Sequence, residues 1–302
     1  MRILIVTNKT LLRNGKQELD TGYHYLQKPL EALGHHVSLY DTVAPVIPDF
    51  RVVVSAFSPD LIFCCFTGNP GITPHEPWND ILRITRQGKI KTFNWFCDDT
   101  WRFENFSKHI CWYFTHCSTP EPSYVDKFKD TGYKNILLGC WHVNSDYYPE
   151  TKKDIDISFV GGMNQSRSEF FSALDDPVTI GQNLSIEDLF DFYCRSKIGV
   201  NLSLNSNDPE GKTQMKQRVF ELAAAKCVVL TEYHPGVESF FEVGKEIVTF
   251  STPEEFTEKA NYLLSNPQEA SEIAERGHAR FLKEHESKVR LNSMLEEIFD
   301  GA

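Results

Sequence analysis

Short apolar runs alternate with amphipathic stretches along the chain, and this pattern predicts a series of β-α-β units. Arg2–Thr7 is a β-branched apolar run, which is typical of a buried parallel strand. Apolar residues then recur at helical spacing from Tyr23 to Leu33, and Gly34 ends that helix. Val37–Tyr40 predicts the next strand. A strand, a helix and a strand in this order form a βαβ unit.

The same alternation continues through the first half of the chain. Residues 8–20 are expected to form a polar loop, and a helix is predicted near Asn79–Gln87. Further strands are predicted at Leu61–Phe66, Lys91–Phe96, Cys111–Thr115 and Asn135–Leu138. We therefore expect an open, doubly wound parallel sheet in this half.

The polar, charged segment Tyr148–Asp154 predicts a domain boundary, after which the pattern begins again. The second half predicts strands at Asp156–Val160, Ile198–Leu202, Cys227–Thr231 and Glu246–Phe250, and helices at Met215–Ala225, 252–264, 267–285 and 287–299. We expect an N-terminal Rossmann-like domain over residues 1–152 and a C-terminal one over residues 153–285. Residues 286–302 are expected to form a helix that packs back toward the first domain.

The fold class predicted from this pattern is α/β, with two Rossmann-like domains facing across a cleft. In such sheets ligands bind beyond the carboxyl ends of the strands. Clefts between domains are also frequent ligand sites. Residues that directly follow each strand are therefore the candidates for function.

Charge is unevenly distributed over the 302 residues, which carry a formal net charge of -11. Residues 1–150 contain 15 Lys and Arg against 16 Asp and Glu, so the excess of acidic residues lies in the second half. Phosphate backbones attract basic surfaces, and we therefore expect no nucleic-acid partner. No apolar run approaches the roughly 18 residues of a membrane helix, so we expect no transmembrane segment.

Eight cysteines are present, and no two of them form a C-x-x-C pair. Most of them lie in apolar runs such as LIFCCF (61–66) and AAAKCVVL (223–230). This placement favours reduced cysteines in the cores and a cytoplasmic location.

Three stretches carry residues suited to binding or chemistry, and the first is 212–221. Lys212, Lys216 and Arg218 gather positive charge near the start of a predicted helix, where anions are favoured. Glu221 lies within the apolar part of that helix, three residues after Arg218. The pattern is compatible with a nucleotide site, with Glu221 on the ribose and the cations on the phosphates. It is equally compatible with an internal Arg–Glu pair on a solvated helix edge.

The second stretch, FVGGMNQSR (159–167), places Gly161 and Gly162 directly after a strand. Glycines at such a point allow a phosphate to approach the backbone amides, and Arg167 could pair with that phosphate. A simple turn from strand to helix would have the same sequence. The full G-x-G-x-x-G pattern is absent.

The third stretch, FNWFCDDTWRF (93–103), places Asp98 and Asp99 after a strand and among aromatic residues. A carboxylate there could act as a general base or bind a sugar hydroxyl group. Aspartate is also a common helix N-cap, so one of the two is expected to serve that structural role.

Several of these residues also carry a resemblance to a known family. The run K-x-Q-x-K-x-R-x-F-E (212–221), the following CVVLTE (227–232) and FFEVGKEIVTFSTPEEF (240–256) resemble the C-terminal domain of CgeB-like glycosyltransferases, which are group 1 enzymes with the GT-B fold. DISFVGGMNQSR, NWFCDDTWRF and HESKVRLNSML resemble other segments of that family.

The resemblance implies a metal-independent, hexosyltransferase-like enzyme, with UDP or GDP as the nucleotide. The C-terminal domain would hold the nucleotide-sugar donor, and the N-terminal domain would hold an acceptor that is a glycan, a protein or a small molecule. Glu221 matches the second glutamate of the E-x₇-E motif, which contacts the donor ribose, whereas Thr213 occupies the position of the first. No cofactor and no bound metal are implied, and the nucleotide-sugar is a substrate.

Two other functions remain open on the same residues. A nucleotide-sugar epimerase of this fold would act on the donor alone, without an acceptor. A non-catalytic nucleotide-sugar-binding protein would bind the nucleotide without turnover, and Thr213 in place of glutamate is compatible with it.

Overall fold

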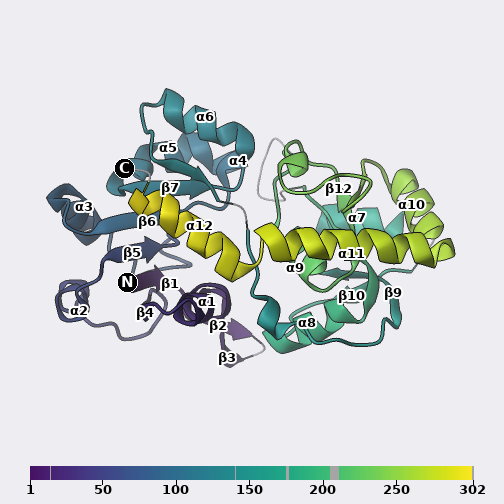
Figure 1. Ribbon diagram of the computed structural model, residues 1–302, viewed down its shortest axis with the longest axis horizontal. Coiled ribbons are helices and arrows are strands. Elements are labelled where there is room, and N and C mark those ends of the chain that lie inside the picture. The colour runs from purple at the N-terminus through teal and green to yellow at the C-terminus, as the bar shows by residue number, and fades with distance from the viewer. Residues whose placement is uncertain (14, 140, 175–176, 205–210, 301–302) are drawn as a thin grey trace. The chain divides into compact units, whose positions relative to one another are not determined.

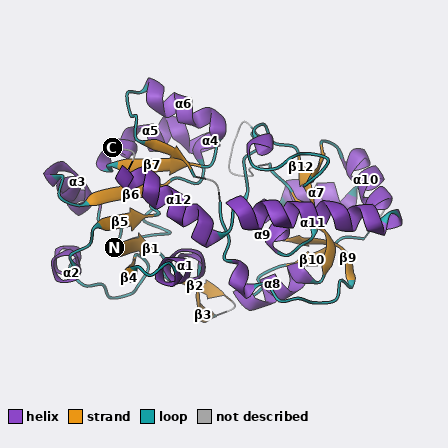
Figure 2. Ribbon diagram, viewed as in Figure 1, coloured by secondary structure: helices purple, strands orange, loops and turns teal. Residues whose placement is uncertain are grey.

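The chain forms two compact units in the computed structural model, which describes residues 1–13, 15–139, 141–174, 177–204 and 211–300. The first unit comprises Met1–Cys140 together with Ser287–Ala302, and the second comprises Trp141–Glu286. Each unit has a parallel sheet with helices around it (Figures 1 and 2). The predicted α/β fold class is confirmed.

Six parallel strands in the order β4-β1-β5-β6-β7-β8 form the sheet of the first unit. The strands are β1 (Arg2–Thr7), β4 (His36–Asp41), β5 (Leu61–Cys64), β6 (Lys91–Trp95), β7 (His116–Thr119) and β8 (Ile136–Leu138). Every residue of β5 is buried, as is all of β1 after Arg2, which is why both strands read as continuous apolar runs. The strand order reverses between β1 and β5, and such a reversal is where doubly wound sheets bind ligands.

The helical segments of the first unit connect these strands, with one exception. They are η1 (Gly22–Gln27), α1 (Lys28–Ala32), α2 (Phe50–Phe57), α3 (Trp78–Gln87), α4 (Asp99–Arg102), η2 (Phe103–Ser107), α5 (Lys108–Ile110), η3 (Cys111–Tyr113) and α6 (Pro122–Asp130). The exception is α12 (Ser287–Asp300), which comes from the far end of the chain and contacts α1 and η1.

Two local predictions in the first unit are wrong. The expected polar loop contains a hairpin of β2 (Thr10–Arg13) and β3 (Lys16–Leu19). The expected strand at 111–115 is instead the turn η3 and its exit, because Cys111 and Phe114 enter the core from that turn. Thr115 forms hydrogen bonds with both the backbone and the side chain of Thr92, and β7 begins only after it.

Five parallel strands in the order β10-β9-β11-β12-β13 form the sheet of the second unit. The strands are β9 (Ile155–Val160), β10 (Thr179–Gly181), β11 (Ser196–Asn201), β12 (Val228–Glu232) and β13 (Val248–Phe250). β9 pairs with β10 on one side and with β11 on the other, so the strand order reverses between β9 and β11. This reversal identifies the carboxyl ends of β9 and β11 as the place to seek a ligand site.

The helices of the second unit follow the predicted pattern, with further segments at η4, α7, α8 and η5. They are η4 (Ser145–Tyr147), α7 (Gln165–Ser172), α8 (Ile186–Cys194), α9 (Gln217–Ala224), η5 (Val237–Ser239), α10 (Pro253–Ser265) and α11 (Pro267–Glu284). Gly199 of β11 allows α9 to pack closely, because a Cβ at that position would lie only 2.1 Å from Leu222. The absence of a side chain at Gly199 therefore helps to set the position of α9.

The described cysteines are seven free thiols, all buried or half-buried, and Cys140 lies outside the described residues. Burial raises the pKa of several of these thiols, to about 12 for Cys111 and about 11 for Cys227. Within the described ranges, no helix combines the length and the apolar character needed to cross a membrane.

Candidate functional site

A cluster of polar side chains lies at the carboxyl ends of β9 and β11. Arg218, in the first turn of α9, donates from Nε to the carbonyl oxygen of Val160 at 2.9 Å. Its Nη1 donates to Oδ1 of Asn201 at 3.0 Å. Val160 ends β9 and Asn201 ends β11. The guanidinium group therefore bridges the two strands between which the strand order reverses.

Arg167 joins Arg218 at this cluster. The Cζ atoms of Arg218 and Arg167 lie 4.6 and 5.5 Å from the centre of the Phe159 ring. Nη1 of Arg167 donates to the carbonyl oxygen of Gly162 at 2.5 Å, and its backbone amide donates to Oδ1 of Asn164. Burial lowers the pKa of Arg167, and the positive charge of Arg218 lowers it further. Two cations held close together favour an anion as a third partner.

Neither of these arginines forms an ion pair with a carboxylate of the described residues, and their hydrogen bonds are to carbonyl and amide oxygens. Other cations of the second unit are differently placed. Arg195 forms a bidentate pair with Asp154, and Lys197 pairs with Asp156. The two arginines at the end of β9 therefore form a positive centre within an acidic half of the chain.

The two predicted glycines have different surroundings. A Cβ at Gly161 would lie 2.9 Å from Nη2 of Arg218 and 3.1 Å from the Phe159 ring. A Cβ at Gly162 would meet nothing within 4 Å. Gly161 therefore makes room for the Arg218 side chain, whereas Gly162 borders open space next to Arg167.

Glu221 is half-buried on α9, and Tyr193 is buried on α8. The pKa of the Tyr193 hydroxyl is raised by burial first and by the negative charge of Glu221 second, while Arg218 lowers it. Tyr193 therefore lies within reach of both charges. Glu221 thus lies near Arg218 on α9, and Arg218 in turn lies next to Gly161 and Arg167 at the end of β9.

The other residues predicted for this site lie on the segment that leads into α9. Lys212 is exposed, and Lys216 is half-buried at the N-cap position. Oγ1 of Thr213 lies 3.0 Å from Nδ1 of His234, which is buried beyond the end of β12. This segment therefore brings further polar groups to the same edge of the sheet.

Asp98 and Asp99 lie in the first unit, beyond the end of β6, and their environments differ. Asp98 is half-buried at the N-cap position of α4, but its side chain makes no capping hydrogen bond. Asp99 is 0% exposed, and neither carboxyl oxygen has a hydrogen bond of normal geometry within the described residues. Burial raises the pKa of Asp99 to about 7; Ser107 and Thr119 oppose the rise, and Glu121 and Asp98 add to it.

Asp98 lines a small cavity of about 60 Å³, whose wall includes Cys97, Arg102 and Phe106. The guanidinium group of Arg102 lies 4.0 Å from the centre of the Phe106 ring. This hollow combines a carboxylate, a cation and aromatic surface. Such a combination can bind a hydroxyl-bearing molecule.

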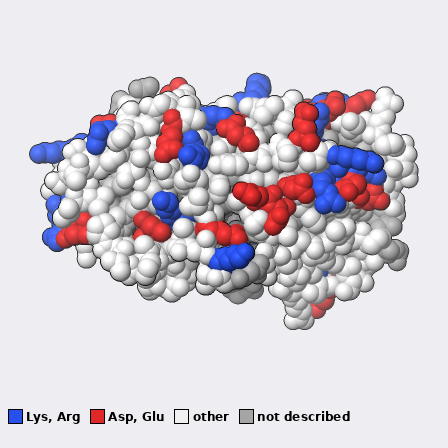
Figure 3. Space-filling view, turned by 90° about the horizontal axis from the view of Figure 1, so that it is seen from below, with Lys and Arg blue, Asp and Glu red and all other residues white. Residues whose placement is uncertain are grey.

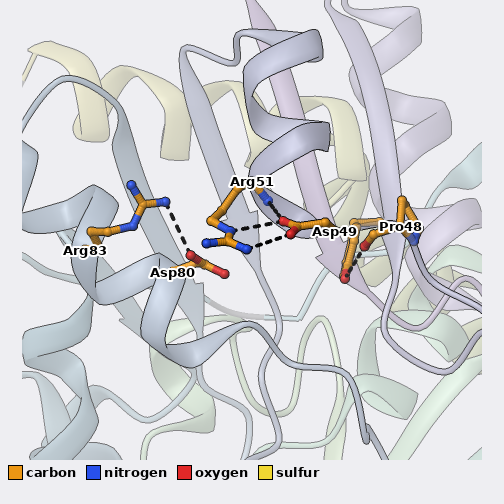
Figure 4. Close-up of polar contacts among 6 residues, drawn as sticks. Pro48, Asp49, Arg51, Asp80 and Arg83 are labelled. Carbon is orange, nitrogen blue, oxygen red and sulfur yellow. Dashed lines mark hydrogen bonds and ion pairs between the residues drawn. The ribbon is translucent and has the colours of Figure 1, made fainter.

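A polar cluster at the start of α2 shows the opposite situation, in which the charges are paired (Figure 4). Asp49 caps α2 by accepting a hydrogen bond from the backbone amide of Arg51, and it also pairs with the Arg51 guanidinium group at 2.7 Å. These bonds lower the pKa of Asp49 to about 2. Arg83 pairs with Asp80 nearby. On the face in Figure 3, acidic and basic side chains are likewise interspersed.

A cavity of about 300 Å³, lined by both apolar and charged residues, lies at the other edge of the second sheet. Ile198 and Val228, at the amino ends of β11 and β12, line it together with residues of α10 and α11. None of the predicted site residues lines this cavity. Ligands of parallel sheets bind at the carboxyl edge, so the arginine cluster is the better candidate.

The described residues include no group of three or more His, Cys, Asp or Glu side chains placed to hold a metal ion. Arg218 lies next to Gly161, and Arg167 donates a hydrogen bond to the carbonyl oxygen of Gly162.

Sequence reasoning missed three residues of the cluster: Phe159, Tyr193 and Asn201. Phe159 lies in the stretch 159–167 but was given no role there, and Asn201, at the end of a strand, belongs to no recognised motif. The useful signal was their position, because the last residues of β9 and β11 flank the reversal in strand order. Tyr193 had no comparable signal, since it resembles any other aromatic residue of an amphipathic helix.

Comparisons with known proteins agree with this geometry. Residues 149–296 match the sequence model of a family described as Glycosyl transferase-like. A search of curated protein sequences gave no match.

Solved structures share the fold over essentially the whole chain. HepE from Anabaena, in complex with UDP and glucose, matches with a TM-score of 0.64 and 11% identity, covering 100% of both chains. Sucrose-phosphate synthase from Thermosynechococcus elongatus matches with a TM-score of 0.69 and 11% identity, again over 100% of both. A glycosyltransferase from Rickettsia africae matches with a TM-score of 0.65 and 13% identity, covering 100% of this chain and 99% of its own.

The structural matches establish the fold, and the family match covers the unit that carries the arginine cluster. Both agree with the enzyme class expected from the sequence. Residues 149–296 thus match a glycosyl transferase-like family and the whole chain has the GT-B fold, and both agree with a transferase that uses a nucleotide-sugar donor.

Proposed function

We propose that the donor is a UDP-sugar and that its diphosphate binds between Gly161-Gly162 and the side chains of Arg167 and Arg218. The observation that carries this proposal is the pair of guanidinium groups at the reversal in strand order, which form no ion pair with any carboxylate that the structure describes. Uridine is supported by two fold relatives. HepE was crystallised with UDP-glucose, and a DNA-modifying β-glucosyltransferase has uridine diphosphoglucose as its substrate.

In this proposal the arginines assist departure of the nucleoside diphosphate. Negative charge on the diphosphate grows as the bond to the sugar breaks, and cations held in place stabilise that charge. Arg218 is held by Val160 and Asn201, so little reorganisation is needed. Lys212 and Lys216 extend the positive region along the segment before α9. Glu221 accepts hydrogen bonds from the ribose hydroxyl groups, one for each carboxylate oxygen.

For the acceptor we propose that the first unit supplies the site and that the reaction inverts the anomeric centre. Asp98 is then the general base, because it is half-buried beside a hollow that a hydroxyl group can enter. Asp99 is too deeply buried to touch an acceptor, and its raised pKa suits a residue that helps to position α4. Both carboxylates were candidates from the sequence, and their different burial favours Asp98.

The subfamily, the cellular location and the absence of a metal or cofactor requirement are also proposals. The run K-x-Q-x-K-x-R-x-F-E supports a place among CgeB-like enzymes. The free thiols of the described cysteines support a cytoplasmic location. The cluster of cations supports a reaction that needs no bound metal and no cofactor.

Thermal shift and calorimetry with a panel of nucleotides test the proposal. A ligand that binds only the folded protein raises its melting temperature, and we expect UDP to do so more than GDP. Arg218→Ala and Arg167→Ala should each weaken UDP binding about tenfold or more, because each removes charge-assisted hydrogen bonds. Arg195→Ala is the matched control, since Arg195 is paired with Asp154 at the other edge of the sheet. UDP affinity that is unchanged in both site variants would contradict the proposal.

A further inference from the structure

Asn201, the last residue of β11, is 0% exposed and forms hydrogen bonds with three other side chains. We infer that Asn201 is a positioning residue, which holds the Arg218 guanidinium group toward the donor diphosphate without neutralising its charge. This inference rests on the proposed donor site. Asn201 itself reaches no ligand and acts through Arg218.

Both the oxygen and the nitrogen of the Asn201 side-chain amide form hydrogen bonds. Oδ1 accepts the hydrogen bond from Nη1 of Arg218 at 3.0 Å. Nδ2 donates to Oγ of Ser203 at 3.1 Å and to Oγ1 of Thr231 at 2.9 Å. An asparagine amide offers one acceptor atom and two N–H donors, so this environment orients the amide in one sense only. The oxygen must face Arg218.

The groups that hold the amide are themselves anchored to β12. Oγ of Ser203 donates to the carbonyl oxygen of Glu232 at 2.9 Å. The backbone amides of Ser203 and Leu204 donate to Oε2 of Glu232 at 2.7 and 2.8 Å. A buried network in which each member is satisfied is rigid. Asn201 is therefore held by the end of β12, and it holds the Arg218 side chain in turn.

The neutrality of the amide matters as much as its position. A carboxylate at residue 201 would have nearly the same shape and would form an ion pair with Arg218. The same unit shows such a pair where no ligand site is proposed, between Arg195 and Asp154. At the arginine cluster the structure instead uses an amide oxygen and a backbone carbonyl. Arg218 is thus held by neutral partners.

Asn201→Asp tests this inference, with UDP as the probe in isothermal titration of the full chain. We expect UDP affinity to fall about tenfold or more, because the new carboxylate competes with the diphosphate for Arg218. The melting temperature without UDP should fall, because an aspartate cannot donate the two hydrogen bonds that Nδ2 makes to Ser203 and Thr231, whose hydroxyl groups already donate to Glu232. A purely structural role predicts the same fall in melting temperature with an unchanged UDP affinity, and that result would overturn the inference.

The double variant with Arg218→Ala separates this inference from the donor site on which it rests. If Asn201 acts through Arg218, Asn201→Asp should add no further loss of UDP affinity once Arg218 is absent. An equal loss in both backgrounds would overturn the positioning role. If Arg218→Ala weakens UDP binding and Asn201→Asp does not, only this inference fails. If Arg218→Ala itself has no effect, the donor site and the role of Asn201 fail together.

Discussion

The Cζ atom of Arg218 lies 4.6 Å from the centre of the Phe159 ring, so a cation of α9 rests on an aromatic residue of β9. A guanidinium group over an aromatic face is attracted by the electrons of the ring. The ring supports the guanidinium group on one side, and Gly161 leaves room for Nη2 on another. The site therefore depends on the shape of the β9 end as well as on charge.

Gly161→Ala should weaken UDP binding about tenfold. The added Cβ would lie only 2.9 Å from Nη2 of Arg218 and would displace the guanidinium group, so that a charge-assisted hydrogen bond to the diphosphate is lost. Gly162→Ala is the matched control for stability, since nothing lies within 4 Å of its added Cβ. Thermal unfolding of both variants and titration with UDP check this expectation. Unchanged UDP affinity in Gly161→Ala would show that the position of Arg218 does not govern donor binding.

Glu221→Gln should reduce UDP affinity by about ten- to hundredfold while the fold survives. The amide keeps the shape of the side chain but lacks its charge, and charge-assisted bonds to the ribose are worth about 1.5–3 kcal/mol. Isothermal titration with UDP, together with a melting curve, measures both effects. A lower melting temperature with unaltered affinity would assign Glu221 a structural role on α9.

Asp98→Asn should lower turnover about 10²- to 10⁴-fold and leave UDP affinity nearly unchanged, because a general base acts on the acceptor in the transition state. Single-turnover rates with a donor and an identified acceptor, measured beside UDP titrations, check this. Asp99→Asn is the companion variant, and we expect it to retain most of the turnover. Full activity in Asp98→Asn with loss in Asp99→Asn would reverse the two assignments.

Asp99→Asn should also change how stability depends on pH. The pKa of Asp99 is about 7 in the folded protein, against an ordinary value of 3.8. From pH 4 to 7 the unfolded chain releases a proton that the folded protein keeps, so the native protein loses stability as the pH rises. The asparagine variant lacks this loss.

Melting curves of the native protein and Asp99→Asn at pH 5 and pH 8 measure the effect. The melting temperature of the variant should rise relative to that of the native protein as the pH rises. Each kcal/mol of unfolding free energy corresponds to roughly 2–4 °C in a domain of this size. A difference in melting temperature that is the same at both pH values would contradict the raised pKa.

The fold was predictable wherever burial and sequence pattern agree. β1 and β5 are buried along almost their whole length, and both read as apolar runs. β7 is also fully buried, but its sequence is HCST, and hydrophobic pattern alone assigns no strand to such a run. The apolar residues just before it form a turn, because their side chains reach the core without extended backbone.

The candidate site was predictable only in its parts. Gly161, Arg167, Arg218 and Glu221 stand out because glycine after a strand and charge within an apolar helix are unusual. Their arrangement was not predictable, because Arg218 bonds to a carbonyl group 58 residues away in the chain. Asn201 stayed unnoticed for the same reason, since its importance comes from partners that only the folded sheet brings together.

The assignment of α12 to the first unit has a consequence for synthesis on the ribosome. α12 follows the whole second unit in the chain, yet it contacts α1 and η1, and four of its apolar side chains are buried: Leu291, Met294, Leu295 and Ile298. Domains generally fold as they emerge, the N-terminal one first. Here the unit that emerges first must wait for a helix translated after the entire second unit, so the second unit can complete its chain while the first still lacks a packing element.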